Sequence, residues 1–254
     1  MSETTYALGK LPARKDAIQL KFATYLQRAA LPPIPAQFGH EDLETAPWQM
    51  LGNDKVGDCV LAGGGHETML WNIEAGKSVE FSQKNTLADY SAITGYNPDD
   101  PASDQGTDME LAAKYRRKTG LLDAAGKRHK VAAYLDLTPG DLTEHYAALY
   151  LFGAVGIGIK FPKSAMEQFN AGEPWDVVPG AELEGGHYIP LVAKRDMLEC
   201  VTWGRIQPMT EAFFNEYNDE SVAYVSGETL HGGKSLEGFN LRQLKADLAQ
   251  ITAA

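Results

Sequence analysis

The chain has 254 residues, a formal net charge of −11 at pH 7 and an apolar content of 44%. This length suits one large domain or two tightly associated lobes. The negative charge argues against binding to nucleic acids or anionic membranes, because both require a cationic protein face. The longest apolar run, residues 146–159, is too short and too rich in glycine to span a bilayer.

The cysteine content and the N-terminus indicate where the protein resides. The only two cysteines are Cys59 and Cys200, which excludes a disulfide framework. The N-terminus lacks the basic and apolar regions of a signal peptide. We therefore expect a cytoplasmic protein, with virion association and non-classical export as alternatives.

The first part of the chain contains an N-terminal extension, residues 1–30, with a basic stretch at 15–28 that could be helical. Whether this extension is a blocking strap, an oligomer contact or a brace stays open. Prolines make residues 31–37 extended. Turn-forming residues at 53–58 then precede a stretch with helical spacing of its apolar side chains. The residues on that helical face are Cys59, Ala62, His66, Met69 and Leu70.

Further along, the spacing predicts a helix at 109–119 that ends at Gly120, and another helix that begins near Asp141. Strand-like patterns follow at 154–160, 187–193, 198–203 and 222–226, and a closing amphipathic helix at 241–251. A helix-rich first half and a strand-rich second half predict an α+β fold whose two lobes meet at a cleft.

Cys59 is the candidate nucleophile. A thiol at the start of a helix faces unpaired backbone N–H groups and the positive end of the helix dipole, which together lower its pKa. Small residues follow at 62–65 and allow close approach of another lobe or a substrate. Cys200, in the middle of an apolar strand pattern, is expected to be a buried structural thiol.

His187 is the best candidate for the base that partners this thiol. It opens an apolar strand directly after Gly185 and Gly186, where the backbone can approach a ligand or the opposite lobe. His66 lies two helical turns beyond Cys59, roughly 10 Å along the axis. We therefore expect His66 to be a buried polar group.

The order of these features resembles the papain-like cysteine peptidases over residues 31–226. Individual matches include the turn 56–59 before the cysteine, the glycine-bearing loop 104–109, the strand 153–159, the histidine strand 186–192 and the Thr-Trp-Gly segment 202–204. The resemblance is to a divergent member of bacterial or phage type that lacks disulfides.

The resemblance implies a helical lobe at about 45–145 that carries the nucleophile helix and an antiparallel, β-barrel-like lobe at about 146–226. Residues 227–254 would form a tail with the closing helix. It also assigns roles. Asn53 stands where the family keeps a glutamine amide for the oxyanion hole, and Trp203 would shield His187. The residues expected to line the substrate cleft are Gln105, Gly106, Thr107, Gly186 and Trp203.

One departure concerns the residue that orients the histidine. The family has an asparagine two residues before the tryptophan, where this chain has Val201. The orienting role is therefore vacant, or filled by Thr202, Asn215 or Asp219.

The mechanism implied is acyl transfer through a Cys59 thioester, with His187 as general base and acid and no cofactor. The substrate would be a peptide or amide, and neither nucleic acid nor membrane is expected as a partner. Two alternatives stay open: a binding or structural protein with decayed catalytic residues, and a transglutaminase-like acyltransferase. The sequence does not specify subsite preference or oligomeric state.

Overall fold

The computed structural model describes residues 5–39, 47–227 and 239–253. Its helices are α1 (Phe22–Tyr25), α2 (Cys59–Glu74), α3 (Gln83–Thr94), the 3₁₀ helix η2 (Pro101–Ser103), α4 (Met109–Lys118), α5 (Leu142–Phe152), α6 (Lys163–Ala171), α7 (Glu211–Tyr217) and α9 (Leu241–Ala253). Its strands are β1 (Phe38–Gly39), β2 (Leu121–Leu122), β3 (Arg128–His129), β4 (Val131–Asp136), β5 (Val155–Pro162), β6 (Leu183–Lys194), β7 (Leu198–Thr202), β8 (Arg205–Met209) and β9 (Asn218–Ser226).

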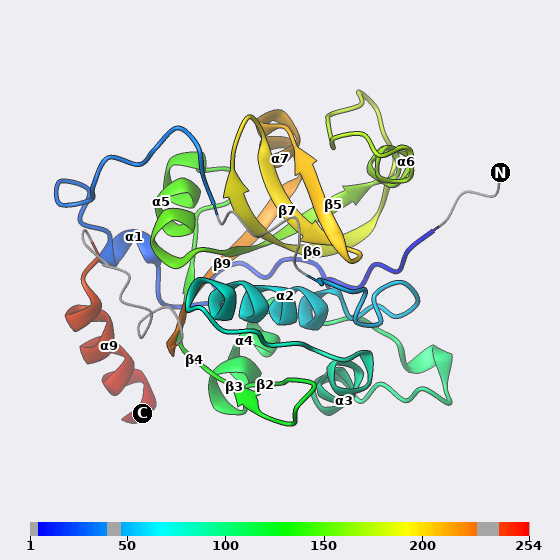
Figure 1. Cartoon of the computed structure of the whole chain (residues 1–254), viewed down its shortest axis with the longest axis horizontal. Helices are drawn as coiled ribbons and strands as arrows, with labels where there is room; N and C mark the ends of the chain where they lie inside the picture. The colour runs from blue at the N-terminus through cyan, green and yellow to red at the C-terminus, as the bar shows by residue number, and fades with distance from the viewer. Residues whose placement is uncertain (1–4, 40–46, 228–238, 254) are drawn as a thin grey trace.

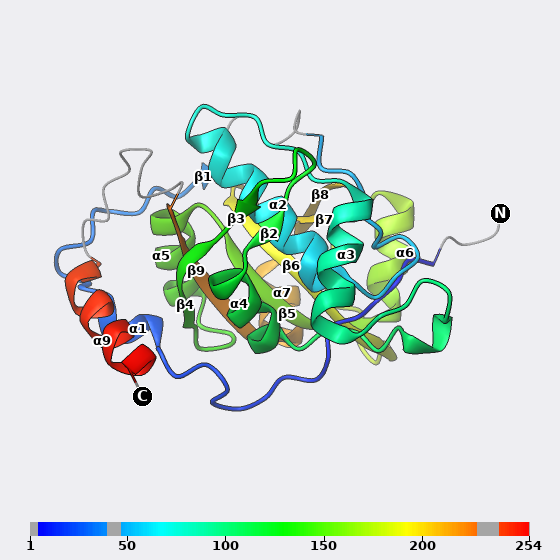
Figure 2. The same ribbon diagram turned by 90° about the horizontal axis from the view of Figure 1, so that it is seen from below.

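The main sheet is antiparallel and has seven strands. Six follow the order β4-β9-β5-β6-β7-β8, and β1 pairs with the end of β6. Helices α2, α3 and α4 lie together on one side of this sheet with the small β2–β3 hairpin, while α5 and α7 lie on the other side (Figures 1 and 2). The α+β, two-lobed fold predicted from the sequence is therefore confirmed.

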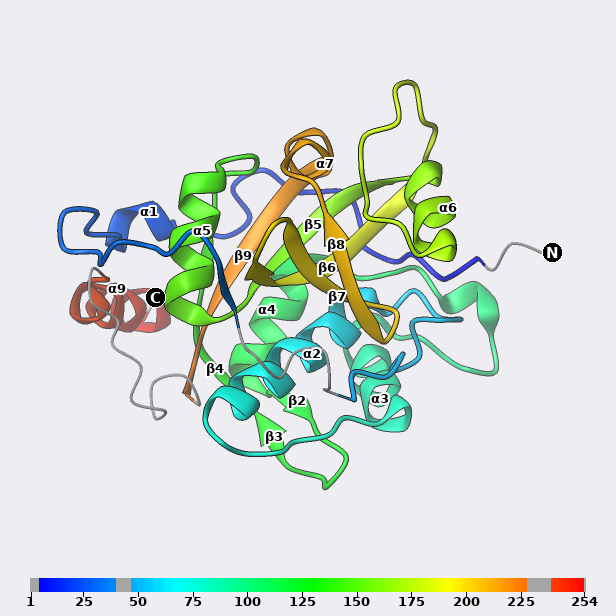
Figure 3. The same cartoon turned by 45° about the horizontal axis from the view of Figure 1, so that its top comes forward.

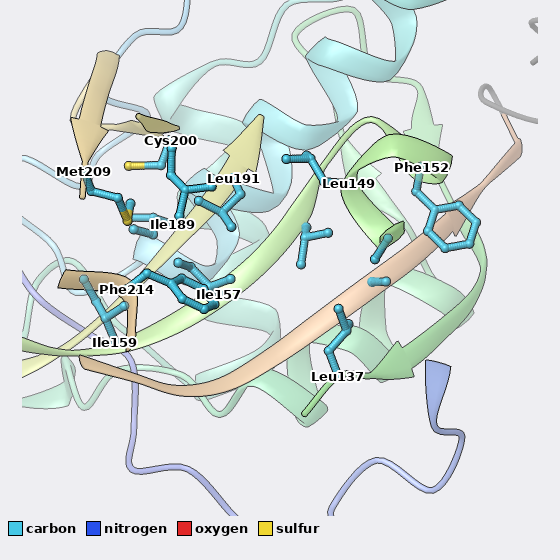
Figure 4. Packing of buried hydrophobic residues seen from close by; sticks show 14 of the residues in the cluster. Leu137, Leu149, Phe152, Ile157, Ile159, Ile189, Leu191, Cys200, Met209 and Phe214 are labelled. Atoms are coloured by element: carbon cyan, nitrogen blue, oxygen red, sulfur yellow. The ribbon is translucent and has the colours of Figure 1, made fainter. Parts of the chain in front are cut away.

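A hydrophobic core fills the side of the sheet that α5 and α7 cover. Leu149 and Phe152 of α5 belong to this core together with Ile157 and Ile159 of β5 and Ile189 of β6, and Ile159 lies near Phe214 of α7 (Figure 4). Because neighbouring strand residues point to opposite faces, the residues between these isoleucines face the helical lobe. Cys200 is fully buried in the same core, as expected of a structural thiol.

The central helix α2 is buried on nearly all sides and carries Cys59 at its first position. Gly63 lets it lie close against β6, since a Cβ there would be 2.6 Å from the Tyr188 ring. The buried polar side chains of this helix, such as His66 and Glu67, have hydrogen-bond partners on neighbouring segments, as polar groups inside a protein require. The head of α2 is thereby fixed against the strand that carries His187.

An ionic cluster also joins α2 to its neighbours. Glu67 of α2 accepts hydrogen bonds from the Arg116 guanidinium of α4 at 2.5 Å and from the Tyr188 hydroxyl of β6 at 2.7 Å. All three side chains are buried. The charged pair is therefore shielded from water. Substituting only one of its two residues would leave the other charge buried without a partner.

Two local expectations differ from the structure. The basic stretch 15–28 forms only the short helix α1, because the residues before it run extended: Lys21 forms a bridge with Asp136, whose N–H donates to the Leu20 carbonyl. Strand β4 lies in the range assigned to the helical lobe but pairs with β9, so the sheet begins before residue 146.

The closing helix is present as α9 and lies beside α1 at one end of the molecule (Figure 3). The preceding part of the predicted tail, residues 228–238, lies outside the described residues. Within the described ranges, each helix is too short or too polar to cross a membrane.

Candidate active site

Cys59 lies at the N-terminus of α2, and only 1% of its surface is exposed. Burial raises the pKa of the thiol to about 12, against hydrogen bonding from the backbone of Tyr188 and Gly9 that lowers it. The expectation of a low thiol pKa is wrong for this closed form, because desolvation outweighs the helix dipole. The cavity that Cys59 lines is also lined by Tyr188, so the thiol lies near β6.

His187 is held by two neighbours on the strand side of the site. Its Nε2 lies 2.7 Å from Oγ1 of Thr202, and its ring stacks on Trp203 with centroids 4.5 Å apart. Burial lowers the pKa of His187 to about 3. Its Nδ1 is buried and has no hydrogen-bond partner among the described residues. The bond to Thr202 therefore leaves Nδ1 as the ring nitrogen available for chemistry.

A small cavity brings several of the predicted residues together. Its lining includes the predicted residues Asn53, Cys59, Thr202 and Trp203, together with Tyr188 of β6, while His187 is not among its lining residues. His66 also contributes to the lining, but its Nε2 is 2.9 Å from the Trp48 carbonyl and 3.1 Å from that of Gln49. His66 is a buried polar group, as expected.

Asn53 directs its amide at a peptide carbonyl. Its Nδ2 lies 3.3 Å from the carbonyl oxygen of Ala7 and 3.0 Å from that of Val56, and the side chain is buried. The predicted oxyanion donor is thus in contact with a carbonyl that belongs to the N-terminal extension.

Residues 6–11, which we call the N-terminal strap, run between the two lobes across the site (Figure 1). The Gly186 carbonyl accepts from the N–H groups of Gly9 at 3.2 Å and Lys10 at 3.0 Å. On the other side, Thr107 donates to the Gly9 carbonyl at 2.7 Å and accepts from Leu11 at 3.1 Å. The strap therefore occupies the positions at which Gly186 and Thr107 were expected to bind substrate.

Glycines make this close approach possible. A Cβ at Gly9 would lie 1.8 Å from the carbonyl oxygen of Gly57, in the turn just before Cys59. A Cβ at Gly106 would lie 2.3 Å from the Gly9 carbonyl oxygen, and one at Gly186 would lie 2.3 Å from that of Lys10. Side chains at these positions would push the strap out of the cleft.

Two side chains anchor the strap at its ends. Tyr6 stacks on the face of Trp203, with centroids 5.1 Å apart. Lys10 is buried, and its ammonium contacts Asp219 and Glu220 at the start of β9. Trp203 therefore packs against both the strap and His187.

The remaining predicted residues lie elsewhere. Gln105 donates to the Ala102 carbonyl within its own exposed loop. Asn215 is exposed on α7, and Asp219 pairs with Lys10. Of the three residues considered for orienting His187, Thr202 is the one hydrogen-bonded to it.

The sequence did not indicate a network that shapes the turn before Cys59. Asp104 accepts from the Gly57 N–H at 2.9 Å and from the Tyr90 hydroxyl at 2.5 Å, and that hydroxyl accepts from Gly106 at 2.9 Å. The loop that holds the strap is thereby tied to the turn that leads into α2. A blocking strap was one of three roles left open for residues 1–30, and nothing near Gly9 in the sequence singled it out.

We compared the chain with known protein families, curated proteins and solved structures. No protein-family model matches the sequence, and no curated protein matches it either. Among solved structures, the chain resembles xylellain, a cysteine protease from Xylella fastidiosa, with a TM-score of 0.67 and 16% identity over 89% of this chain and 98% of that one.

Two other solved structures that resemble the chain, at lower TM-scores, are also of this kind. Procathepsin B S9 from Trypanosoma congolense gives a TM-score of 0.57 at 10% identity, covering 87% of this chain and 86% of that one. The Carica candamarcensis cysteine protease CMS1MS2, in complex with E-64, gives 0.55 at 11% identity, covering 76% and 99%. The chain therefore has the papain-like fold that its sequence resembled.

Proposed function

We propose that this protein is a papain-like cysteine peptidase whose cleft is closed by its own N-terminal strap. The observation that carries the proposal is that a peptide already lies across Cys59. The Asn53 amide, the Gly186 carbonyl and the Thr107 backbone all hydrogen-bond to main-chain atoms of the strap. A cleft that binds main-chain groups on both sides is suited to a peptide substrate.

The chemistry would proceed in two steps once the strap leaves. The Cys59 thiolate attacks the substrate carbonyl carbon, and His187 passes its proton to the departing amine as the C–N bond breaks. Water then attacks the thioester, with His187 as base, and the acid is released. The Asn53 amide would donate to the oxyanion, a contribution of about 3 kcal/mol.

Thr202 would act as a positioning residue in this reaction. Its hydroxyl is 2.7 Å from Nε2 of His187, which leaves Nδ1 for the thiol. A hydroxyl can fill the role that Val201 cannot, because it can both donate and accept a hydrogen bond. This contact favours an active enzyme over a scaffold with decayed catalytic residues.

Burial explains why the closed chain would be latent. The pKa of Cys59 is raised to about 12 and that of His187 is lowered to about 3, so both are neutral near pH 7. Water admitted by release of the strap would favour the charged forms and allow the thiolate–imidazolium pair.

The test uses the full-length Gly9→Ala chain, in which the added Cβ prevents the strap from seating. We expect it to hydrolyse a denatured protein or a peptide mixture, with new termini detected by mass spectrometry. The Gly9→Ala/Cys59→Ala chain is the matched control and should give no new termini. Equal cleavage by both chains, or none by Gly9→Ala, would contradict the proposal.

A second arm separates hydrolysis from acyl transfer. A peptide ester is supplied to the Gly9→Ala chain with and without an amine acceptor. We expect the free acid as the main product in both cases. Exclusive formation of the amide would establish a transferase instead.

A further inference from the structure

The strap places one of its side chains in an acidic socket beside the candidate site. The socket consists of Gly158 on β5 and Asp219 and Glu220 on β9. The Lys10 ammonium lies 2.9 Å from Asp219 Oδ1 and 3.2 Å from Glu220 Oε1. Only 1% of the Lys10 side chain is exposed, so the ion pair is largely withdrawn from water.

An irregularity in the sheet allows both carboxylates to meet one ammonium. Neighbouring residues of a regular strand point to opposite faces. Here the β5–β9 register shifts between Gly158 and Ile159, which pair with Glu220 and Asn218 respectively, so Asp219 is the extra residue of a bulge. The Asn218 amide fixes the bulge through bonds to the Gly158 and Glu220 carbonyls, both at 3.0 Å.

Gly158 gives the socket its room. A Cβ there would lie 2.0 Å from Cε of Lys10. The neighbouring inward positions of β5, Ile157 and Ile159, face the opposite core, so the missing side chain at Gly158 opens space only on the cleft side. The socket therefore accepts a long side chain that reaches the carboxylates past the strand.

The socket also lies close to the reacting groups. The Lys10 N–H donates to the Gly186 carbonyl, and Gly186 directly precedes His187. The preceding residue, Gly9, packs against Gly57, two residues before Cys59, since a Cβ at Gly9 would lie 1.8 Å from the Gly57 carbonyl oxygen. The side chain in the socket therefore belongs to the residue that directly follows the one lying nearest the nucleophile.

We propose that this socket selects a lysine or arginine side chain of the substrate, within two residues of the bond that is cleaved. The inference rests on the proposed peptidase function, whose substrate class it specifies. When the strap leaves, two carboxylates remain with no cation between them, and a cationic side chain from the substrate restores the pair. An apolar side chain would leave the two carboxylates, which are only 13% and 20% exposed, without a cation, and a site built to bind a charged group disfavours such a substrate.

Binding can be tested without catalysis. The probe is the hexapeptide Tyr-Ala-Leu-Gly-Lys-Leu, the sequence of the strap, and its partner has norleucine in place of lysine. Calorimetry measures binding of each to the full-length Gly9→Ala/Cys59→Ala chain. We expect the lysine peptide to bind about tenfold or more tightly. Equal affinity of the two peptides, or binding of neither, would overturn the proposal.

A matched pair of protein variants assigns the preference to the socket. Asp219→Asn/Glu220→Gln in the same chain should remove the preference for lysine over norleucine. Glu167→Gln/Glu216→Gln removes two exposed carboxylates elsewhere and changes net charge equally. This control should keep the preference, and its loss there would attribute the effect to overall charge rather than to the socket.

The last experiment compares the rates at which a lysine substrate and its norleucine analogue are hydrolysed. The Gly9→Ala chain should show a higher kcat/KM, by about tenfold or more, for a lysine substrate than for its norleucine analogue. Equal rates would overturn the specificity even if the enzyme is active. Conversely, a lysine preference in binding without hydrolysis of either substrate would uphold the socket and overturn the peptidase function.

Discussion

Nε2 of His187 lies 2.7 Å from the hydroxyl oxygen of Thr202, the residue after Val201. This contact fixes which ring nitrogen is free, because Nδ1 on the other side of the ring has no hydrogen-bond partner among the described residues. A threonine can therefore orient the histidine where the papain-like pattern would have an asparagine one position earlier.

Thr202→Val in the Gly9→Ala chain should lower kcat by about 10- to 100-fold with little change in KM, because it removes a buried hydrogen bond that acts through His187. Thr202→Ser keeps the hydroxyl and should restore most of the rate. Steady-state kinetics across pH check this. Equal losses in the serine and valine variants would show that packing, rather than the hydroxyl, is what matters.

The strap should control access to Cys59. Gly9→Ala places a Cβ 1.8 Å from the Gly57 carbonyl oxygen, so we expect alkylation of Cys59 by iodoacetamide to accelerate on the order of 100-fold or more at pH 7. Gly227→Ala is the matched control, since a Cβ there meets nothing within 4 Å. Mass spectrometry locates the label. If both variants label as slowly as the original chain, the strap does not close the site.

Stability should fall as the pH is lowered from 6.5 toward 4. Burial lowers the pKa of His66 and His145 to about 4 and that of His187 to about 3. The unfolded chain therefore binds protons that the folded chain does not, and each histidine destabilises the fold by about 1.4 kcal/mol per pH unit in this range.

Urea unfolding at pH 7, 6 and 5 measures this slope. His145→Gln should reduce it by one histidine's share, because it removes a group buried between Asp141 and Ser221. A free energy of unfolding that stays constant from pH 7 to 5 would contradict the burial of these imidazoles.

The buried pair of Glu67 and Arg116 should be costly to break from one side. Arg116→Met leaves the Glu67 carboxylate in the interior and should lower the free energy of unfolding by about 3–5 kcal/mol. The double variant Glu67→Met/Arg116→Met removes both charges and should recover much of that loss. Chemical denaturation of the four chains gives the coupling energy, and additive effects would show that the pair is not linked.

Much of the site could be predicted from local sequence. Cys59 begins a helix after turn-forming residues, as its sequence context indicated. The strand predicted from His187 onward is also present, but it begins earlier, at Leu183, so His187 and the two glycines before it lie inside β6. The fold class followed from the change of periodicity between the two halves. These features depend on neighbouring residues, which a single sequence contains in full.

Contacts between distant segments could not be predicted. The fit of Gly9 against Gly57 and Gly106 joins three glycines that look ordinary one at a time. Lys10 gave no sign of its carboxylate partners in β9, because a sheet bulge brings those two side chains together. Asp104, in the loop 104–109, gave no sign that it would bind the Gly57 N–H in the turn before Cys59.

We infer that Cys59 and His187 form a reactive pair once the strap is displaced. The most direct measurement is the rate of Cys59 alkylation against pH in the full-length Gly9→Ala chain, compared with the same chain carrying His187→Ala or His66→Ala. We predict fast labelling near neutral pH that His187→Ala abolishes and His66→Ala preserves. Slow labelling in the Gly9→Ala chain, or equal effects of the two histidine substitutions, would contradict the account.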